Sequence, residues 1–380
     1  MIRFPTTLSK QQFLDQYWQK KPLLFRKALA NAEQFISKEQ LFKLSVNDQV
    51  ESRLLLEDGP EHSWQTFHGP QQSSQLQSLE HSTNWTLLVQ SVNLWLDNCS
   101  DLLKAFDFIP QWRLDDIMVS FATKNGSVGP HLDQYDVFLI QLTGKRRWMA
   151  AEANAAVEEN TQVTTIKQVK PFKAIVDDVL EAGDMLYVPP NTAHHGVNLE
   201  DGMTLSIGFR SPALSEALML FAEQLMLAGN ESFYKDAPLT EDAHSAEISS
   251  AAMTKASNWI NDLDDFSELK RKTFGLLQTQ PKQELIYVAP NEELSSFFSK
   301  PFHLDRDPSS RVAWYQVDEN SIWLFINGEL FERTSAEKDW ITLLSSVNSL
   351  SSGNITQQLS EDKFIILLEI FVETGLFGIK

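Results

Sequence analysis

Cysteine is nearly absent from this sequence of 380 residues, which contains Cys99 alone. A single cysteine excludes a disulfide within the chain and a zinc site with several thiolate ligands. The start of the chain lacks the apolar run and cleavage site of a secretory signal, and no later apolar run is long enough to cross a bilayer. We therefore expect a cytoplasmic protein with no membrane partner, which agrees with the reducing conditions that keep thiols free.

Basic residues are also scarce. The chain has 32 Lys and Arg against 51 Asp and Glu, for a formal charge of -19. A phosphate backbone is bound by clustered Lys and Arg, so this balance argues against direct nucleic-acid binding. It suits a basic protein partner, because opposite charge speeds encounter.

Short β-rich runs dominate the middle of the chain. Gly, Pro and Asn dipeptides separate them, and no helical pattern intervenes. Such a series indicates an antiparallel barrel or jelly roll within a first domain, residues 1–212. The expected strands are 116–122, 135–142, 145–151, 171–176, 184–190 and 203–209. Helices are expected before them at 5–20, 37–46 (with Ser37 as N-cap) and 84–98.

Two further regions follow the β-rich domain. Residues 213–290 are mostly helical in pattern, beginning with a Leu- and Met-rich helix that ends at Gly229. Residues 291–380 combine two alternating strand patterns with two helical patterns, a winged-helix-like composition. Within them, residues 301–380 carry 6 Lys and Arg against 12 Asp and Glu, so we expect no DNA binding there.

A candidate metal site lies in the β-rich domain. His131 and Asp133 are two residues apart at the start of an expected strand, so their side chains share a face. The segment PPNTAHHG supplies His194 and His195 some sixty residues later. Either histidine would complete a set of two imidazoles and one carboxylate, which leaves open positions on iron(II) for oxygen chemistry. The same set could hold zinc or manganese, and a lone His-x-Asp pair is common by chance.

The turn LTGKRRW could discriminate between these metals. If iron acts with 2-oxoglutarate, the far carboxylate of that co-substrate needs a buried cation, and the planar fork of Arg matches a carboxylate. Strand alternation puts Arg146 beside Trp148 and opposite Lys145 and Arg147. The alternative is an exposed basic hairpin end.

At this point the sequence resembles a known family. The motifs GPHLDQYDVF, TGKRRW, GDMLYVPPNTAHHG and SIGFRSP resemble the cupin-type JmjC oxygenases, most closely the bacterial ribosomal oxygenases that hydroxylate an arginine of a large-subunit ribosomal protein. The similarity extends to WQKKPLLFRKA and NWTLLVQSVNLW, and so covers nearly the whole chain. It implies a mainly β core, a double-stranded β-helix, followed by a helical dimerisation region and the winged-helix-like domain. It also implies Fe(II), with 2-oxoglutarate and dioxygen as co-substrates, and a homodimer.

The resemblance also assigns residues. The iron ligands of the family fall on His131, Asp133 and His194, because its second histidine lies four residues after the second Pro of a Pro-Pro turn. The co-substrate carboxylate falls on Arg146, with a hydroxyl from Ser120.

The substrate arginine of the family falls on Asp116 and Tyr135, and Met118 shares the strand face of Asp116. An exposed Asp and a core Tyr are the plain alternatives for the first two. A histidyl hydroxylase of ribosomal proteins is the nearest rival function. Other rivals are a non-catalytic metal-bound cupin that binds basic proteins and a zinc or manganese cupin acting on small molecules.

Overall fold

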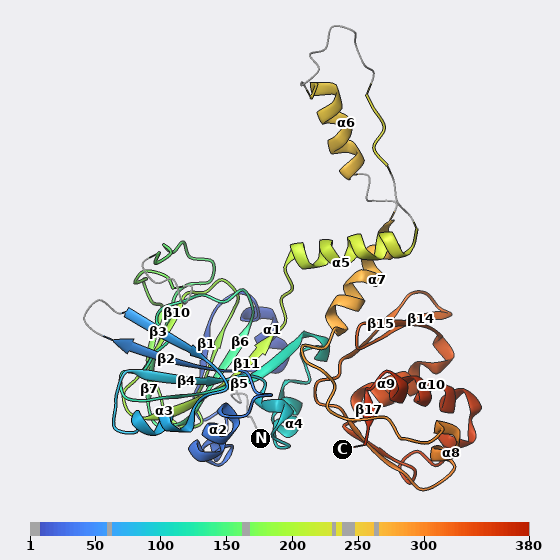
Figure 1. Ribbon diagram of the computed structural model, residues 1–380. Coiled ribbons are helices and arrows are strands. Elements are labelled where there is room, and N and C mark those ends of the chain that lie inside the picture. Colours follow the sequence, from blue (N-terminus) through green and yellow to red (C-terminus); the bar gives the residue numbers. More distant parts are fainter. Residues whose placement is uncertain are drawn as a thin grey trace. The chain divides into compact units, whose positions relative to one another are not determined.

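The computed structural model describes residues 8–58, 63–161, 168–229, 233–237, 248–261 and 266–379. The chain divides into two units, residues 1–211 and 212–380 (Figure 1). Among the described residues, no helix has the length and apolar character needed to cross a membrane.

The first unit consists mainly of strands with short helices before and between them. Its elements are α1 (Lys10–Gln16), β1 (Leu23–Phe25), η1 (Ala32–Gln34), α2 (Lys38–Ser45), β2 (Ser52–Asp58), β3 (Ser63–His68), α3 (Ser73–Ser78), β4 (Trp85–Val89), η2 (Val92–Leu94), α4 (Cys99–Leu103), η3 (Lys104–Phe106), η4 (Gln111–Arg113), β5 (Leu114–Ala122), β6 (Val137–Thr143), β7 (Arg146–Ala150), β8 (Val176–Leu180), β9 (Met185–Val188), β10 (His194–Asn198) and β11 (Gly202–Phe209).

Two sheets form the predicted double-stranded β-helix. The larger has the order β1-β9-β6-β11-β5-β4-β2-β3, and the smaller has the order β10-β7-β8. Val137 and Leu139 of the larger sheet pack with Trp148 and Leu180 of the smaller one, so the two sheets face each other. Alternate residues of the larger sheet, such as Phe138, point the other way into a core shared with the N-terminal segments.

The N-terminal helices begin at serine caps. The Ser37 hydroxyl accepts a hydrogen bond from the Gln40 N–H, and the Gln40 side-chain oxygen accepts one from the Ser37 N–H, as the predicted cap requires. The first predicted helix is shorter than expected, because α1 begins after a similar cap at Ser9. Residues 5–7 of that prediction lie outside the described residues.

The helix predicted at 84–98 is wrong. Residues 85–89 form strand β4, all five of them buried, and β4 pairs with β2 and β5 inside the larger sheet. A short run buried on both faces is apolar at every position, so its periodicity does not separate helix from strand. The single helical turn η2 follows it.

The strand predicted at 171–176 is also misplaced. The strand that pairs with β7 is β8, which begins at Val176. Its acidic residues Asp177 and Asp178 are strand residues, and β8 lies at the edge of the smaller sheet. Asp177 bonds to Arg147 at 2.6 and 2.7 Å, which explains how a strand can carry two adjacent carboxylates there.

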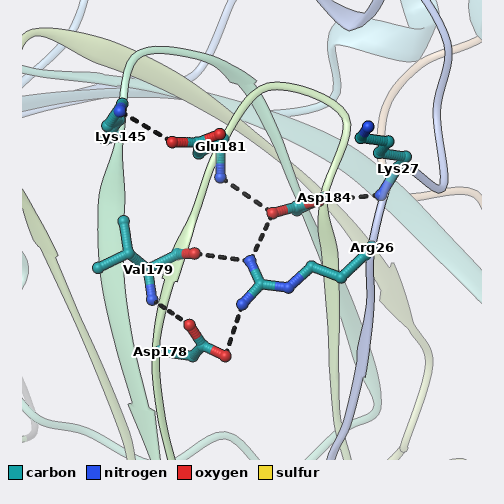
Figure 2. Close-up of polar contacts among 7 residues, drawn as sticks. All are labelled: Arg26, Lys27, Lys145, Asp178, Val179, Glu181 and Asp184. Carbon is teal, nitrogen blue, oxygen red and sulfur yellow. Dashed lines mark hydrogen bonds and ion pairs between the residues drawn. The ribbon is translucent and has the colours of Figure 1, made fainter.

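A network of ion pairs joins β8, the turn after it and the chain after β1 (Figure 2). Arg26 lies 2.5 Å from Asp178 and 2.7 Å from Asp184, and it donates to the Val179 carbonyl at 2.7 Å. Glu181 pairs with Lys145 at 2.8 Å. Each carboxylate of this stretch, namely Asp177, Asp178, Glu181 and Asp184, therefore pairs with a basic residue of the same domain.

The second unit combines helices with two small sheets. Its elements are α5 (Leu214–Leu227), α6 (Ser250–Asn261), α7 (Ser267–Thr279), α8 (Leu294–Phe298), β12 (His303–Arg306), β13 (Val312–Gln316), β14 (Ser321–Ile326), β15 (Glu329–Thr334), η6 (Ser335–Glu337), α9 (Lys338–Ser346), β16 (Ser349–Ser351), η7 (Gln358–Ser360), α10 (Asp362–Glu373) and β17 (Phe377–Gly378). The sheets have the orders β16-β12-β17 and β13-β14-β15. The predicted paired strands and the two final helices are present, whereas the boundary near residue 290 stays a prediction.

Phe13 tests how α1 is attached to the β core. It is fully buried, with ring centroids 5.0 Å from Tyr187 and 5.7 Å from Phe138. Phe13→Ala should lower the free energy of unfolding of the first unit by about 3–5 kcal/mol, because it removes a large buried side chain. Urea denaturation measures this, with the part-exposed Phe67→Ala as control. Equal losses in both variants would show that α1 is not part of the core.

Candidate active site

Two histidines face each other across the site. The His131 N–H donates to the His194 carbonyl at 3.0 Å, and the His194 N–H donates back to the His131 carbonyl at 2.8 Å. Their ring centroids are 4.2 Å apart. Contrary to the prediction, His131 and Asp133 lie in the loop before β6 and not within the strand. The two backbone hydrogen bonds to His194, and not a strand, therefore fix the position of His131.

Asp133 completes the group. Its Oδ2 lies 3.9 Å from His131 Nε2 and 3.6 Å from His194 Nε2, and the three candidate ligand atoms all lie within 4.8 Å of one another. The Asn191 N–H donates to the Asp133 carbonyl at 2.8 Å and ties this loop to the segment before β10. Two imidazole nitrogens and one carboxylate oxygen form a suitable set for a divalent transition metal.

Both imidazoles are prepared for metal binding. His131 Nδ1 lies 3.0 Å from the Gly129 carbonyl, and His194 Nδ1 lies 2.9 Å from the Thr192 carbonyl. A carbonyl accepts but does not donate, so Nδ1 carries the proton and the Nε2 lone pair faces the shared point. Burial, helped by the neighbouring His131, lowers the pKa of His194 to about 4, so this ring is neutral at pH 7.

His195 is outside this group. Its Nε2 lies 3.1 Å from the Ser127 hydroxyl, whereas His194 faces His131 and Asp133. The spacing of the residues allowed either histidine as the third ligand, and the structure brings His194 to His131 and Asp133. Ser127 was missed from the sequence; it also donates to the Gly196 carbonyl at 2.8 Å.

A buried cation lies near the histidines. Arg146 is 3% exposed, its guanidinium lies over the Trp148 ring at 4.6 Å, and it donates to the Gly196 carbonyl at 3.2 Å. Within the part of the chain that the structure describes, Arg146 Nε and Trp148 Nε1 have no hydrogen-bond partner. Burial lowers the pKa of Arg146 to about 10, so it is still charged at neutral pH. A buried cation with an unpaired donor fits an anionic ligand.

The neighbours of Arg146 point outward. Lys145 pairs with Glu181, and Arg147 pairs with Asp177, with both basic side chains about half exposed. The structure thus gives Arg146 the inward position that strand alternation indicated. Gly196 was not singled out from the sequence, but a Cβ at this position would collide with Arg146 Nε and the Trp148 ring. The space around the cation therefore requires glycine on β10.

Strand β5 presents three of the candidate residues on one face. Asp116, Met118 and Ser120 alternate with Ile117 and Val119, which belong to the apolar core on the other face. Ser120 is buried, and its hydroxyl donates to the Thr204 carbonyl at 3.3 Å. Met118 is half-buried.

The residues that are hydrogen-bonded to the Asp116 carboxylate were not found from the sequence. The Ser91 N–H and hydroxyl both lie 3.3 Å from Asp116 Oδ2. With its side-chain amide turned so that both neighbours are satisfied, Gln90 donates from its nitrogen to the same oxygen at 3.2 Å and accepts from Arg53 at 2.8 Å. Both partners of Asp116 follow the end of β4, which a single sequence does not place beside β5.

Tyr135 is at the edge of this site and not in the core, because it is 40% exposed. Its hydroxyl is hydrogen-bonded to Asp133, and burial of this hydroxyl together with the nearby carboxylates of Asp133, Asp116 and Asp115 raises its pKa. The Tyr135 hydroxyl is therefore neutral at pH 7. Acidic side chains gathered around a hydroxyl form a suitable environment for a cationic ligand.

Asp133 tests the metal centre directly. Asp133→Ala should weaken binding of cobalt(II) by more than about 100-fold, because it removes one of three ligands. Titration calorimetry of the whole chain measures this, and the control is Asp177→Ala, an exposed carboxylate paired with Arg147. Unchanged cobalt affinity in Asp133→Ala would mean that the metal binds elsewhere.

Comparison with known proteins adds family evidence to this geometry. Residues 101–217 match the model of a JmjC domain, and residues 263–376 match that of a ROXA-like winged helix.

Individual relatives cover the chain more fully. It is 34% identical to the ribosomal protein uL16 3-hydroxylase of Escherichia coli over 98% of both chains. It is 36% identical to a probable ribosomal oxygenase of Haemophilus influenzae over 56% of this chain and 52% of that one. The solved structure of the E. coli ribosomal oxygenase YcfD in complex with cobalt and 2-oxoglutarate matches with a TM-score of 0.78 and 32% identity, over 99% of both chains.

Proposed function

This chain belongs to the JmjC-domain ribosomal oxygenases, and we propose that it hydroxylates an arginyl side chain of a large-subunit ribosomal protein. The reaction class is 2-oxoglutarate-dependent protein hydroxylation. The observation that carries the proposal is the meeting of His131, Asp133 and His194 next to the buried Arg146. The first candidate substrate is uL16, for which the E. coli relative is named.

The chain's residues would hold Fe(II) through His131 Nε2, His194 Nε2 and Asp133. When bound, iron would supply the oxidative chemistry by which 2-oxoglutarate and dioxygen give succinate and carbon dioxide, with the second oxygen atom placed on a C–H bond of the substrate. The protein's part is to position the reactants and to exclude water from them. Hydrogen bonds from Nδ1 of each imidazole to a carbonyl keep both rings in orientation for this role.

Arg146 and Ser120 would receive the co-substrate. The guanidinium offers donors to the far carboxylate of 2-oxoglutarate, and among the described residues no carboxylate is bonded to this guanidinium. Ser120 adds a hydroxyl from β5. The same cation disfavours a neutral small molecule as the resident ligand.

Asp116 and Tyr135 would bind the substrate arginine, with Met118 against its aliphatic part. A guanidinium has five donors and no acceptor, so it needs carboxylate and hydroxyl oxygens. The side chains near Tyr135 supply these acceptors. A neutral histidyl ring has one donor and needs fewer of them, which is why we favour arginine over the histidyl alternative.

The remaining features agree with a basic protein partner in the cytoplasm. The net charge of -19 would attract a basic ribosomal protein and would make encounter slower at high salt. We also propose a homodimer formed through the helical region. Large apolar side chains are exposed on α5 and α6, namely Leu214, Leu218, Met219, Met226, Leu227, Met253, Trp259 and Ile260.

The test of the function is a reaction with an arginyl peptide of uL16, Fe(II) and 2-oxoglutarate. We expect succinate formation coupled to the mass gain of one oxygen atom on arginine, located by fragmentation. Oxygen found on a histidine would favour the histidyl alternative. No gain on any ribosomal protein, with metal and 2-oxoglutarate bound, would favour the non-catalytic binding protein.

Arg146→Ala should raise the KM for 2-oxoglutarate by about 30-fold or more, since losing a buried charged partner costs about 2 kcal/mol or more. Arg147→Ala is the matched control, because its side chain is half exposed and paired with Asp177. Succinate release at varied 2-oxoglutarate measures both. Equal KM values for the two variants would remove Arg146 from this role.

Asp116→Ala should raise the KM for the arginyl peptide by about tenfold to 100-fold, because it removes a charge-assisted hydrogen bond to the substrate. The KM for 2-oxoglutarate should stay unchanged. Initial rates with each substrate varied in turn measure the difference. A parallel rise in both constants would indicate a general distortion and not loss of a substrate contact.

A further inference from the structure

A buried carboxylate is next in the chain to Tyr135, one of the proposed substrate-binding residues. Asp136 is 0% exposed and follows Tyr135 in the chain, three residues after Asp133. The Tyr187 hydroxyl donates to its Oδ1 at 2.6 Å. This bond crosses from the start of β6 to β9, the strand that leads to His194.

The other oxygen of Asp136 binds the segment before β5. Arg113 Nη2 and the Gln19 side-chain amide each lie 3.1 Å from Asp136 Oδ2. Arg113 is the last residue before β5 and lies three residues before Asp116. One buried ion pair thus joins the backbone that carries Tyr135 to the backbone that carries Asp116.

We propose that Asp136 is a positioning residue, whose ion pair with Arg113 sets the separation of Asp116 and Tyr135 across the substrate pocket. This inference rests on the proposed function, in which these two residues hold the arginyl side chain. Each is one to three residues from its end of the ion pair, so a shift of the pair moves both sides of the pocket. A guanidinium bound between two acceptors is sensitive to their spacing.

Three donors face the carboxyl group of Asp136, and one of them is its ion-pair partner Arg113. Burial raises the pKa of this carboxyl group above its ordinary value, although the bonds from Tyr187, Gln19 and Arg113 act in the opposite direction. Removing one partner of such a pair leaves the other without compensation, so the segment would shift or admit water.

The chain offers a matched control at the other end of the same strand pair. The β6–β9 pairing runs from Val137 opposite Val188 to Ile140 opposite Met185. Asp136 precedes the first pair, and Asp184 precedes Met185 at the far end. Asp184 is also buried and bonds to Arg26 and to the Lys27 N–H at 2.7 and 2.9 Å (Figure 2). It therefore ties the N-terminal segment to the barrel without adjoining a substrate residue.

The experiment compares steady-state kinetics of Asp136→Asn, Arg113→Lys and Asp184→Asn with the wild type, alongside thermal unfolding. Asp136→Asn should raise the peptide KM by about tenfold, with kcat and the KM for 2-oxoglutarate within about twofold of wild type. Arg113→Lys keeps the positive charge of the ion pair and should therefore retain most of the wild-type affinity for the peptide. Asp184→Asn should lower the unfolding temperature but leave the peptide KM unchanged.

Two results would overturn the positioning role. One is an unchanged peptide KM in Asp136→Asn, and the other is an equal rise in Asp184→Asn. If Asp136→Asn does not fold, Arg113→Gln provides the same test, because it removes the charge from the other end of the ion pair, and an unchanged peptide KM there also overturns the role. A wild type that hydroxylates no arginyl peptide overturns the proposed function itself and, with it, this role toward arginine. A wild type that does so, with variants that match it, overturns the positioning role alone.

Discussion

Two backbone hydrogen bonds between His131 and His194 organise the whole active-site region. They join segments more than sixty residues apart, and each segment then supplies one imidazole to the same point. The carbonyls of Gly129 and Thr192 fix the rings, so the orientation of each ligand depends on its own local backbone. The candidate metal site therefore depends on the pairing of these two segments and not on one loop alone.

The two faces of the larger sheet differ in the side chains that they carry. Ile117, Val119 and Phe138 point into an apolar core covered by the N-terminal segments. On the opposite face, Ser120, Gln141 and Thr204 are buried polar side chains bonded to one another or to the backbone. The face toward the smaller sheet therefore combines these polar side chains with the apolar cluster around Trp148, whereas the other face packs into the larger apolar core.

Much of this arrangement could be predicted from the sequence, because it depends on local properties. These are the β-rich runs, the Ser37 cap and the strand alternation that places the Arg146 side chain on the inward face. The fold class and family were confirmed, while the roles of the individual site residues stay predictions. The helix expected at 84–98 failed because a central strand and a buried helix have the same apolar composition. The partners of Asp116 and Asp136 could not be found, since they depend on strand order, which brings Ser91 beside β5 and Tyr187 beside β6.

Gly196 couples two requirements that look separate in the chain. It leaves room for Arg146 and Trp148, yet it lies on β10 only two residues from His194. Moving β10 outward to make more space beside Arg146 for a longer diacid would also move the His194 imidazole. The length of the acceptable co-substrate and the geometry of the ligand set would thus have to change together, which makes this barrel a poor starting point for redesign toward other oxoacids by single substitutions.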